Sequence, residues 1–164
     1  MRSTLKLGSA LALVVAAAGV TVATASSSGG GGKRSHVLQV TRDAGTDVIL
    51  DLDHSATPDS PAPDSVGDED VFAADFYARG EKVGFDAGVC KLVRPPALFH
   101  CVGTNKFAAG DLTAQFLHDY SQGGSGRFAI TGGTRAYRGA RGQVSYVDHP
   151  APRRDQLTFR FTTR

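Results

Sequence analysis

Apolar and polar residues alternate along most of the chain after residue 70. Within residues 71–77, Phe72, Ala74 and Phe76 occupy every second position, and the same alternation recurs within residues 82–90, 112–116 and 157–162. A period of two is typical of β-strands that bury one face, and no window of 11 residues has the 3.6-residue period of an amphipathic helix. The pattern predicts an all-β fold.

Turn residues such as Arg79-Gly80, Pro95-Pro96 and Gly132-Gly133 divide this pattern into eight strands. The predicted strands cover residues 36–52, 71–78, 82–93, 98–107, 111–118, 127–131, 142–147 and 157–163. Eight antiparallel strands with short connections favour a closed up-and-down β-barrel, which has no open edges and can hold one small ligand. A β-sandwich is the main alternative.

The first 25 residues have a different character from the rest of the chain. Two cations, Arg2 and Lys6, precede an apolar stretch over residues 7–22, and Ala23-Thr24-Ala25 follows it. This arrangement is typical of a secretory signal peptide, and the apolar stretch is shorter than the roughly 20 residues that span a bilayer. We therefore expect residues 1–25 to be cleaved, leaving a secreted protein without stable membrane insertion. An uncleaved anchor is the alternative.

The leader also accounts for the apparent basicity of the chain. It carries two of the 18 Lys and Arg residues and none of the 16 Asp and Glu residues, so the remainder has a formal charge of zero. The pI of about 8.7 is therefore no evidence for binding nucleic acid. The charges are nevertheless uneven, because 12 acids lie within residues 43–86 and eight arginines lie after residue 126.

Two segments of the remaining chain lack a strand pattern. Residues 26–35 form a Gly/Ser-rich run that we expect to be a flexible tether, and residues 36–164 are the barrel domain. Residues 53–70 hold three prolines and six acids, which predicts a long loop. This loop is either a solvated segment or a gate that folds over Arg138 and Arg141.

The cysteine and histidine residues suggest a structural role rather than a metal site. Cys90 and Cys101 lie in neighbouring predicted strands on either side of a turn, which indicates a disulfide in an exported chain. The five histidines form no pattern with metal-ligand spacing. We expect neither a metal nor a cofactor.

Two segments resemble a known family. They are GDEDVFAADFYARGEKVGFDAGVC at residues 67–90 and AITGGTRAYRGARGQV at residues 129–144, with Cys101-Val102-Gly103-Thr104 between them. Together they resemble the bacterial allene oxide cyclase barrel-like proteins and, more distantly, plant allene oxide cyclases and dirigent proteins. The resemblance implies an eight-stranded antiparallel barrel that holds an apolar guest in its lumen, with a homotrimer or other homo-oligomer as its assembly.

Two departures from the family pattern bear on the reaction that the resemblance implies. Arg141 matches the Arg of the dirigent-type ARG stretch, but Arg135-Ala136 stands where many dirigent proteins carry an Asp. The predicted strand 36–52 contains no Glu to match that of the cyclases. The resemblance therefore argues against the reaction of a true allene oxide cyclase.

Polar residues on apolar strand faces are the candidates for catalysis. Asp75, Tyr77, Asp86 and Arg141 are the candidate catalytic residues, and Tyr137 and Arg138 are candidate ligand-binding residues. An Asp in an apolar barrel acts as a general acid or base, while Tyr or Arg stabilises developing negative charge. The alternative is that Asp75 and Asp86 point outward into solvent, because strand phase does not reveal which face is inside.

Three functions follow from the sequence. The first is a secreted barrel that binds a small apolar molecule and acts as a cofactor-independent cyclase or isomerase. The second is a non-catalytic barrel that binds or scavenges such a molecule. The third is a structural or interaction module whose lumen is filled by its own side chains.

Overall fold

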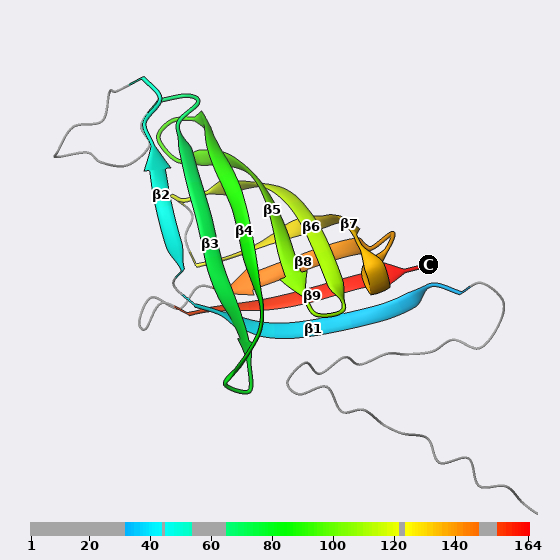
Figure 1. Cartoon of the computed structure of the whole chain (residues 1–164). Coiled ribbons are helices and arrows are strands. Elements are labelled where there is room, and N and C mark those ends of the chain that lie inside the picture. The colour runs from blue at the N-terminus through cyan, green and yellow to red at the C-terminus, as the bar shows by residue number, and fades with distance from the viewer. Residues whose placement is uncertain (1–31, 44, 54–64, 122–123, 148–153) are drawn as a thin grey trace, which may run out of the picture.

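The computed structural model describes residues 32–43, 45–53, 65–121, 124–147 and 154–164. These residues form nine strands and one turn of 3-10 helix, shown in Figure 1. The elements are β1 (Arg34–Arg42), β2 (Thr46–Leu50), β3 (Glu69–Ala78), β4 (Glu81–Arg94), β5 (Leu98–Phe107), β6 (Gly110–Asp119), β7 (Ser125–Gly133), η1 (Arg135–Tyr137), β8 (Arg141–Val147) and β9 (Asp155–Thr163).

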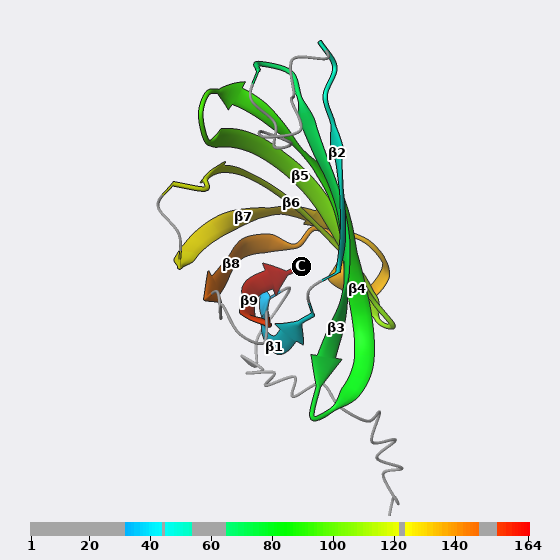
Figure 2. The ribbon, with the colours of Figure 1, turned by 90° about the vertical axis from the view of Figure 1, so that its left-hand side faces the viewer.

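The strands form one antiparallel sheet that closes on itself. Its order is β1-β9-β8-β7-β6-β5-β4-β3-β2, and β1 also pairs with β3. Figure 2 shows how the sheet curls round so that β1 returns to β3. The ring from β1 through β9 to β3 is a closed eight-stranded barrel, which confirms the predicted all-β fold and excludes the sandwich.

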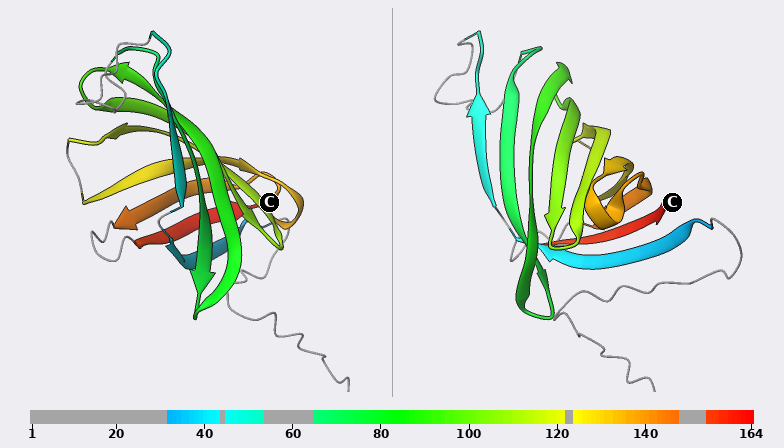
Figure 3. Two further views of the ribbon diagram at one scale, coloured as in Figure 1. Left: turned by 60° about the vertical axis from the view of Figure 1, so that its left-hand side comes forward. Right: turned by 45° about the vertical axis from the view of Figure 1, so that its right-hand side comes forward.

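The predicted first strand, 36–52, consists of two strands with a bend between them. Gly45 has a φ of 62°, and a side chain there would collide with the Ala73 carbonyl. At this bend the chain leaves the ring: β1 pairs with β9 and with the end of β3, whereas β2 pairs with the first half of β3. Figure 3 shows β2 beside β3, where the sheet extends beyond the ring.

One end of the barrel is filled by the protein's own side chains. Phe76, Phe107, Phe159 and Phe161 are buried there and pack with aliphatic residues from β1, β6, β7 and β8. The chain between β7 and β8 covers this end with η1, whose Tyr137 ring packs edge-on against Phe107 and Phe161. We call this half of the molecule the closed end.

A smaller core lies where β3 to β6 extend past the ring. Cys90 and Cys101 face each other across β4 and β5 and form a disulfide with a Cα–Cα distance of 4.0 Å. Leu92 and Phe99 are buried with them, and Phe72 and Phe116 pack against this cluster. The predicted pairing of the two cysteines is confirmed.

The predicted leader, residues 1–25, lies outside the described residues, as does most of the predicted tether. The described end of the tether contributes Arg34 and Ser35 to β1, so this strand begins two residues earlier than expected. Residues 54–64 of the predicted loop are also outside the described residues, while Glu69 and Asp70 begin β3. Within the described ranges, the structure contains no helix long and apolar enough to span a membrane.

Candidate functional site

A pocket of about 520 Å³ opens into the barrel at the end opposite η1. The strand ends around it supply charged, aromatic and hydroxyl-bearing side chains, and we call this region the mouth. Its lining residues are Arg42, Asp47, Asp70, Phe72, Asp86, Cys90, Gly103, Asn105, Phe116, His118, Tyr120, Gly124, Phe128, Tyr146, Asp155 and Leu157.

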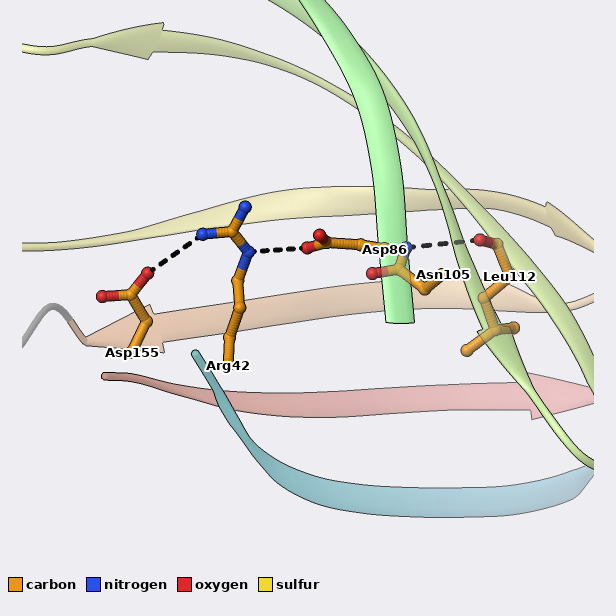
Figure 4. A network of polar contacts seen from close by, with 5 residues as sticks. All are labelled: Arg42, Asp86, Asn105, Leu112 and Asp155. Carbon is orange, nitrogen blue, oxygen red and sulfur yellow. Dashed lines mark hydrogen bonds and ion pairs between the residues drawn. The ribbon is translucent and has the colours of Figure 1, made fainter. Parts of the chain in front are cut away.

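Arg42 connects two carboxylates in the mouth. Its Nε donates to Asp86 Oδ2 at 2.8 Å, and its Nη1 lies 3.6 Å from Asp155 Oδ2. Figure 4 shows the three side chains in a row, reaching into the lumen from β1, β4 and β9. β9 and β4 lie on either side of β1 and β3, where the ring closes, so the network spans this closure.

Asp86 is the most deeply buried carboxyl group of the pocket, with 7% of the residue exposed. Burial raises its pKa above the usual value, and this effect outweighs the opposing influence of Arg42 and of the Ala74 backbone. Among the described residues, none donates a hydrogen bond of ordinary geometry to Asp86 Oδ1. Asp86 therefore has one oxygen held by Arg42 and a second, Oδ1, that is buried without such a bond.

The environment of Arg42 keeps its guanidinium charged. Burial opposes this charge, but the nearby carboxylates of Asp86, Asp155 and Asp47 together raise the pKa of Arg42. The guanidinium also lies 5.6 Å from the centre of the Phe72 ring, a cation–π distance. Gly88 makes room for that ring, because a Cβ there would lie 2.6 Å from Phe72 Cζ.

A second polar group lies on the β6 and β8 side of the mouth. The Tyr146 hydroxyl and His118 Nδ1 are 2.9 Å apart and form a hydrogen bond. The His118 ring packs edge-on against Tyr120 with a centroid distance of 4.1 Å. Tyr120 donates in turn to Asp70 Oδ2 at 3.4 Å. These contacts hold two hydroxyl groups and an imidazole in one wall of the pocket.

Tyr120 is in an environment that opposes its ionisation. Burial raises its pKa to about 12, helped by the negative charges of Asp70 and Asp47. The phenol of Tyr120 therefore stays protonated at neutral pH and acts as a hydrogen-bond donor. Tyr146 is positioned differently, since its ring packs over Gly126, where a Cβ would lie 2.5 Å from the tyrosine Oη.

Of the four candidate catalytic residues, Asp86 lines the pocket. Asp75 and Tyr77 lie on the outer face of β3, because their neighbours Ala74 and Phe76 fill the buried positions. Asp75 pairs there with Lys82, with 2.8 Å between Nζ and Oδ1. Gly88, on the same face of β4 as Asp86, is covered by the Phe72 ring.

Tyr137, Arg138 and Arg141 lie at the closed end. Tyr137, the last residue of η1, is buried in the core, and burial raises the pKa of its phenol. Arg138 and Arg141 are exposed, and Arg141 Nη1 donates to the carbonyl oxygen of Ala140. The structure thus separates these three residues from Asp86 and the mouth. The described flanks of the predicted gate, next to β2 and β3, lie at the other end of the sheet from η1 (Figure 1).

Five residues of the mouth are not among the candidates predicted from the sequence: Arg42, Asp155, His118, Tyr120 and Tyr146. Each continues a row of inward-facing residues by steps of two: Arg42 follows Leu38 and Val40, and Tyr146 follows Val144. The usable signal is therefore a polar or aromatic residue at the end of an apolar inward row.

Three carboxyl groups, those of Asp51, Asp53 and Asp68, lie close enough to hold a metal ion, with ligand atoms within 4.8 Å of one another. Asp68 is fully buried and already accepts hydrogen bonds from the backbone N–H groups of Leu52 and Ser65. These bonds fix the two chain segments that flank residues 54–64, which explains the burial of this carboxylate.

A shallower hollow of about 490 Å³ lies on the outer face of β4 to β7. Backbone, Ala, Val, Thr and Gln residues form its walls, without a titratable side chain among them. It offers no acid or base, and the mouth is therefore the candidate site.

No protein-family model matches the chain, and no curated protein matches its sequence. Several solved structures share its architecture. A pyocyanin demethylase is 24% identical, with a TM-score of 0.60 over 77% of this chain and 98% of that chain. The pterocarpan synthase dirigent protein GePTS1 is 16% identical, with a TM-score of 0.63 over 79% of this chain and 88% of that chain.

An exo-specific intermolecular Diels-Alderase is 14% identical, with a TM-score of 0.54 over 77% of this chain and 98% of that chain. At these identities the likeness concerns the fold. It agrees with the resemblance found in the sequence motifs. The chain therefore shares its eight-stranded barrel fold with these structures, one of which is a dirigent protein.

Proposed function

We propose that the protein binds a small organic molecule in the mouth and catalyses its isomerisation or cyclisation by proton transfer, without a cofactor. The single observation that carries this proposal is the position of Asp86 in the pocket. Arg42 holds one oxygen of this carboxyl group, and the residue lines the pocket although little of it is exposed. A base fixed in this way is oriented before the guest arrives.

The reaction needs a proton to leave one atom of the guest and a proton to reach another. Asp86 accepts the first proton, and its raised pKa makes the carboxylate a stronger base than an exposed Asp. The hydrogen-bonded pair of Tyr146 and His118 lines the same pocket and supplies a donor for developing negative charge. Guest and product then have the same composition, so no further reactant is needed.

The size and lining of the pocket support binding. Its volume lies within the roughly 300–1,000 Å³ common for small-molecule sites, and Phe72, Phe116 and Phe128 give it apolar walls. A module with a completely filled lumen would leave no such space. The similar structures include a demethylase, a dirigent protein and a Diels-Alderase, and this variety supports a general small-molecule barrel.

We also propose that the protein works outside the cytoplasm. The Cys90–Cys101 disulfide is compatible with the export predicted from the leader, because such bonds persist in oxidising compartments.

Binding can be tested with a built-in reporter. The chain contains no Trp, so Phe128→Trp places a unique fluorophore in the pocket wall. Titration with the neutral apolar dye Nile red should quench this fluorescence by energy transfer and reach saturation. The matched variant Phe161→Trp, at the closed end, reports on dye bound elsewhere. Equal quenching of both variants, or none, would overturn binding in the mouth.

Catalysis can be tested by mass. The protein is incubated in D₂O with a small-molecule extract of its source organism, and guests are followed by chromatography and mass spectrometry. Wild type should convert a compound into an isomer that has gained solvent deuterium, and Asp86→Asn should abolish this conversion while retaining the bound guest. A bound guest that wild type leaves unchanged would favour the non-catalytic barrel.

A further inference from the structure

The mouth carries an excess of negative charge although the chain after residue 25 is neutral. Its lining includes four carboxyl groups, those of Asp47, Asp70, Asp86 and Asp155, against the single guanidinium of Arg42. These groups come from five different strands and converge on one opening. Even with Asp86 protonated, the carboxylates outnumber the cation by two. A guest in this pocket therefore meets a negative potential.

The walls between these charges are aromatic. Phe116 and Phe128 stack with a centroid distance of 4.5 Å, and Phe128 lies 6.0 Å from Tyr146. The faces of such rings attract cations, and carboxylates nearby add to the attraction. The protein already uses this combination for its own cation, since Arg42 lies between Asp86, Asp155 and the Phe72 ring.

From this combination we infer that the mouth selects a planar aromatic guest with a positive charge, and that it rejects guests bearing a carboxylate. The inference rests on the proposed binding function and names the class of molecule that this same site takes. It modifies the expectation of a purely apolar guest, because the aromatic walls accept the ring system while the carboxylates accept the charge. Burial is the main cause of the raised pKa of Tyr120, and the further contribution of the charges of Asp70 and Asp47 agrees with a negative potential at this opening.

The test compares three ligands that share one flat three-ring frame. N-methylacridinium is a cation, acridine is neutral at slightly alkaline pH, and acridine-9-carboxylate is an anion. Their binding is measured by fluorescence titration at low and high salt. We expect the cation to bind at least about 10-fold more tightly than the anion at low salt, with acridine between them. Salt should reduce this difference because it screens the charges.

Two matched variants locate the charge effect. Asp47→Asn removes one carboxylate from the rim of the mouth and should weaken binding of the cation by about 2- to 5-fold, with little change for acridine. Asp75→Asn makes the same change in net charge on the outer face and should leave all three affinities unchanged. Circular dichroism of both variants checks that the fold is retained.

Each negative result of these titrations contradicts a different claim. Equal affinity for cation and anion, or preference for the anion, would overturn the charge selection while leaving binding in the mouth intact. An equal effect of Asp47→Asn and Asp75→Asn would show that net charge alone acts, which also overturns it. Failure of all three ligands to bind would contradict the proposed function itself.

Discussion

The two ends of the barrel are built from the same strands but hold opposite kinds of side chain. On β1, Leu38 and Val40 fill the closed end, and Arg42 follows them into the mouth. On β9, Phe161 and Phe159 lie in the core, and Asp155 ends the same strand in the mouth. Along each of these strands, the inward-facing residues are apolar at the closed end and charged in the mouth. Residues that stabilise the fold and residues that line the pocket therefore occupy different parts of the same strand.

The first prediction tests this separation by removing one ring from each end. Phe159 is fully buried and its ring lies 5.4 Å from that of Phe107, so Phe159→Ala should lower the free energy of unfolding by about 3–5 kcal/mol. Phe128→Ala in the pocket wall should cost about 1–2 kcal/mol, because that ring is only half-buried. Urea unfolding measures both, and equal costs would contradict the comparison.

The second prediction concerns the disulfide beside the mouth. The double variant Cys90→Ala/Cys101→Ala should lose about 3 kcal/mol of stability, because the bond closes a short loop and so restricts the unfolded chain. Reduced wild type serves as the matched control and should unfold at a similar urea concentration. If reduction leaves the midpoint unchanged, the disulfide contributes little and the mouth is held by the sheet alone.

The third prediction uses the raised pKa of Asp86. Asp86→Asn keeps an oxygen that can accept from Arg42 Nε but removes the ionisable group, so it serves as the reference without this titration. The folded state holds the Asp86 proton more tightly than the unfolded state. The stability of wild type relative to Asp86→Asn should therefore be greatest in acid and fall as the pH rises from about 4 through the raised pKa.

Unfolding in urea at a series of pH values measures this difference. Arg42→Gln is the informative companion, because it removes the charge that lowers the pKa of Asp86 and should extend the fall to higher pH. If the stability of wild type relative to Asp86→Asn rose with pH, Arg42 rather than burial would be the main influence on the pKa of Asp86.

The fourth prediction alters the mouth without removing a polar group. Gly126→Ala places a methyl group where the Tyr146 ring lies, so the ring must move and its hydrogen bond with His118 should weaken. The stability cost should be about 1 kcal/mol. NMR of the His118 imidazole nitrogens measures the lost bond. Gly132→Ala, on the same strand, is the control and should leave these signals unchanged; a shift in both would contradict a local effect.

The smallest effect is expected outside the barrel. Asp75→Asn breaks an ion pair with Lys82 on the outer face, where both side chains are more than a third exposed. Solvent screens such pairs, so neither the urea midpoint nor ligand affinity should change measurably. A loss of activity in this variant would return Asp75 to the catalytic residues that the sequence suggested.

The strands were predictable because the alternation of apolar and polar residues can be read directly from the sequence. Predicted strands 71–78 and 98–107 match β3 and β5 within two residues, since their apolar rows end at turn residues. The division of the first strand was not predicted. A glycine within a polar turn does not reveal that the two halves of the strand pair with different parts of β3.

The site was harder to predict than the fold because it depends on which face is inside. Asp75 and Asp86 are both acids within alternating strands, yet only Asp86 shares a face with buried Cys90 and Leu92. Large aromatics at Phe72 and Phe76 mark the inner row of β3 and could have excluded Asp75. The partners Arg42 and Asp155 lie 113 residues apart in sequence, and the pairing of β1 with β9 brings them together.

The short pairing of β1 with β3 gives Arg42 a second consequence. The ring closes there through Thr41 opposite Tyr77 and Arg42 opposite Phe76, with one further hydrogen bond from Asp43 N–H to the Asp75 carbonyl. Arg42, which binds Asp86, thus lies where the ring of strands closes. A guest bound beside Asp86 would therefore lie at this closure, so binding in the mouth and closure of the ring would be thermodynamically linked.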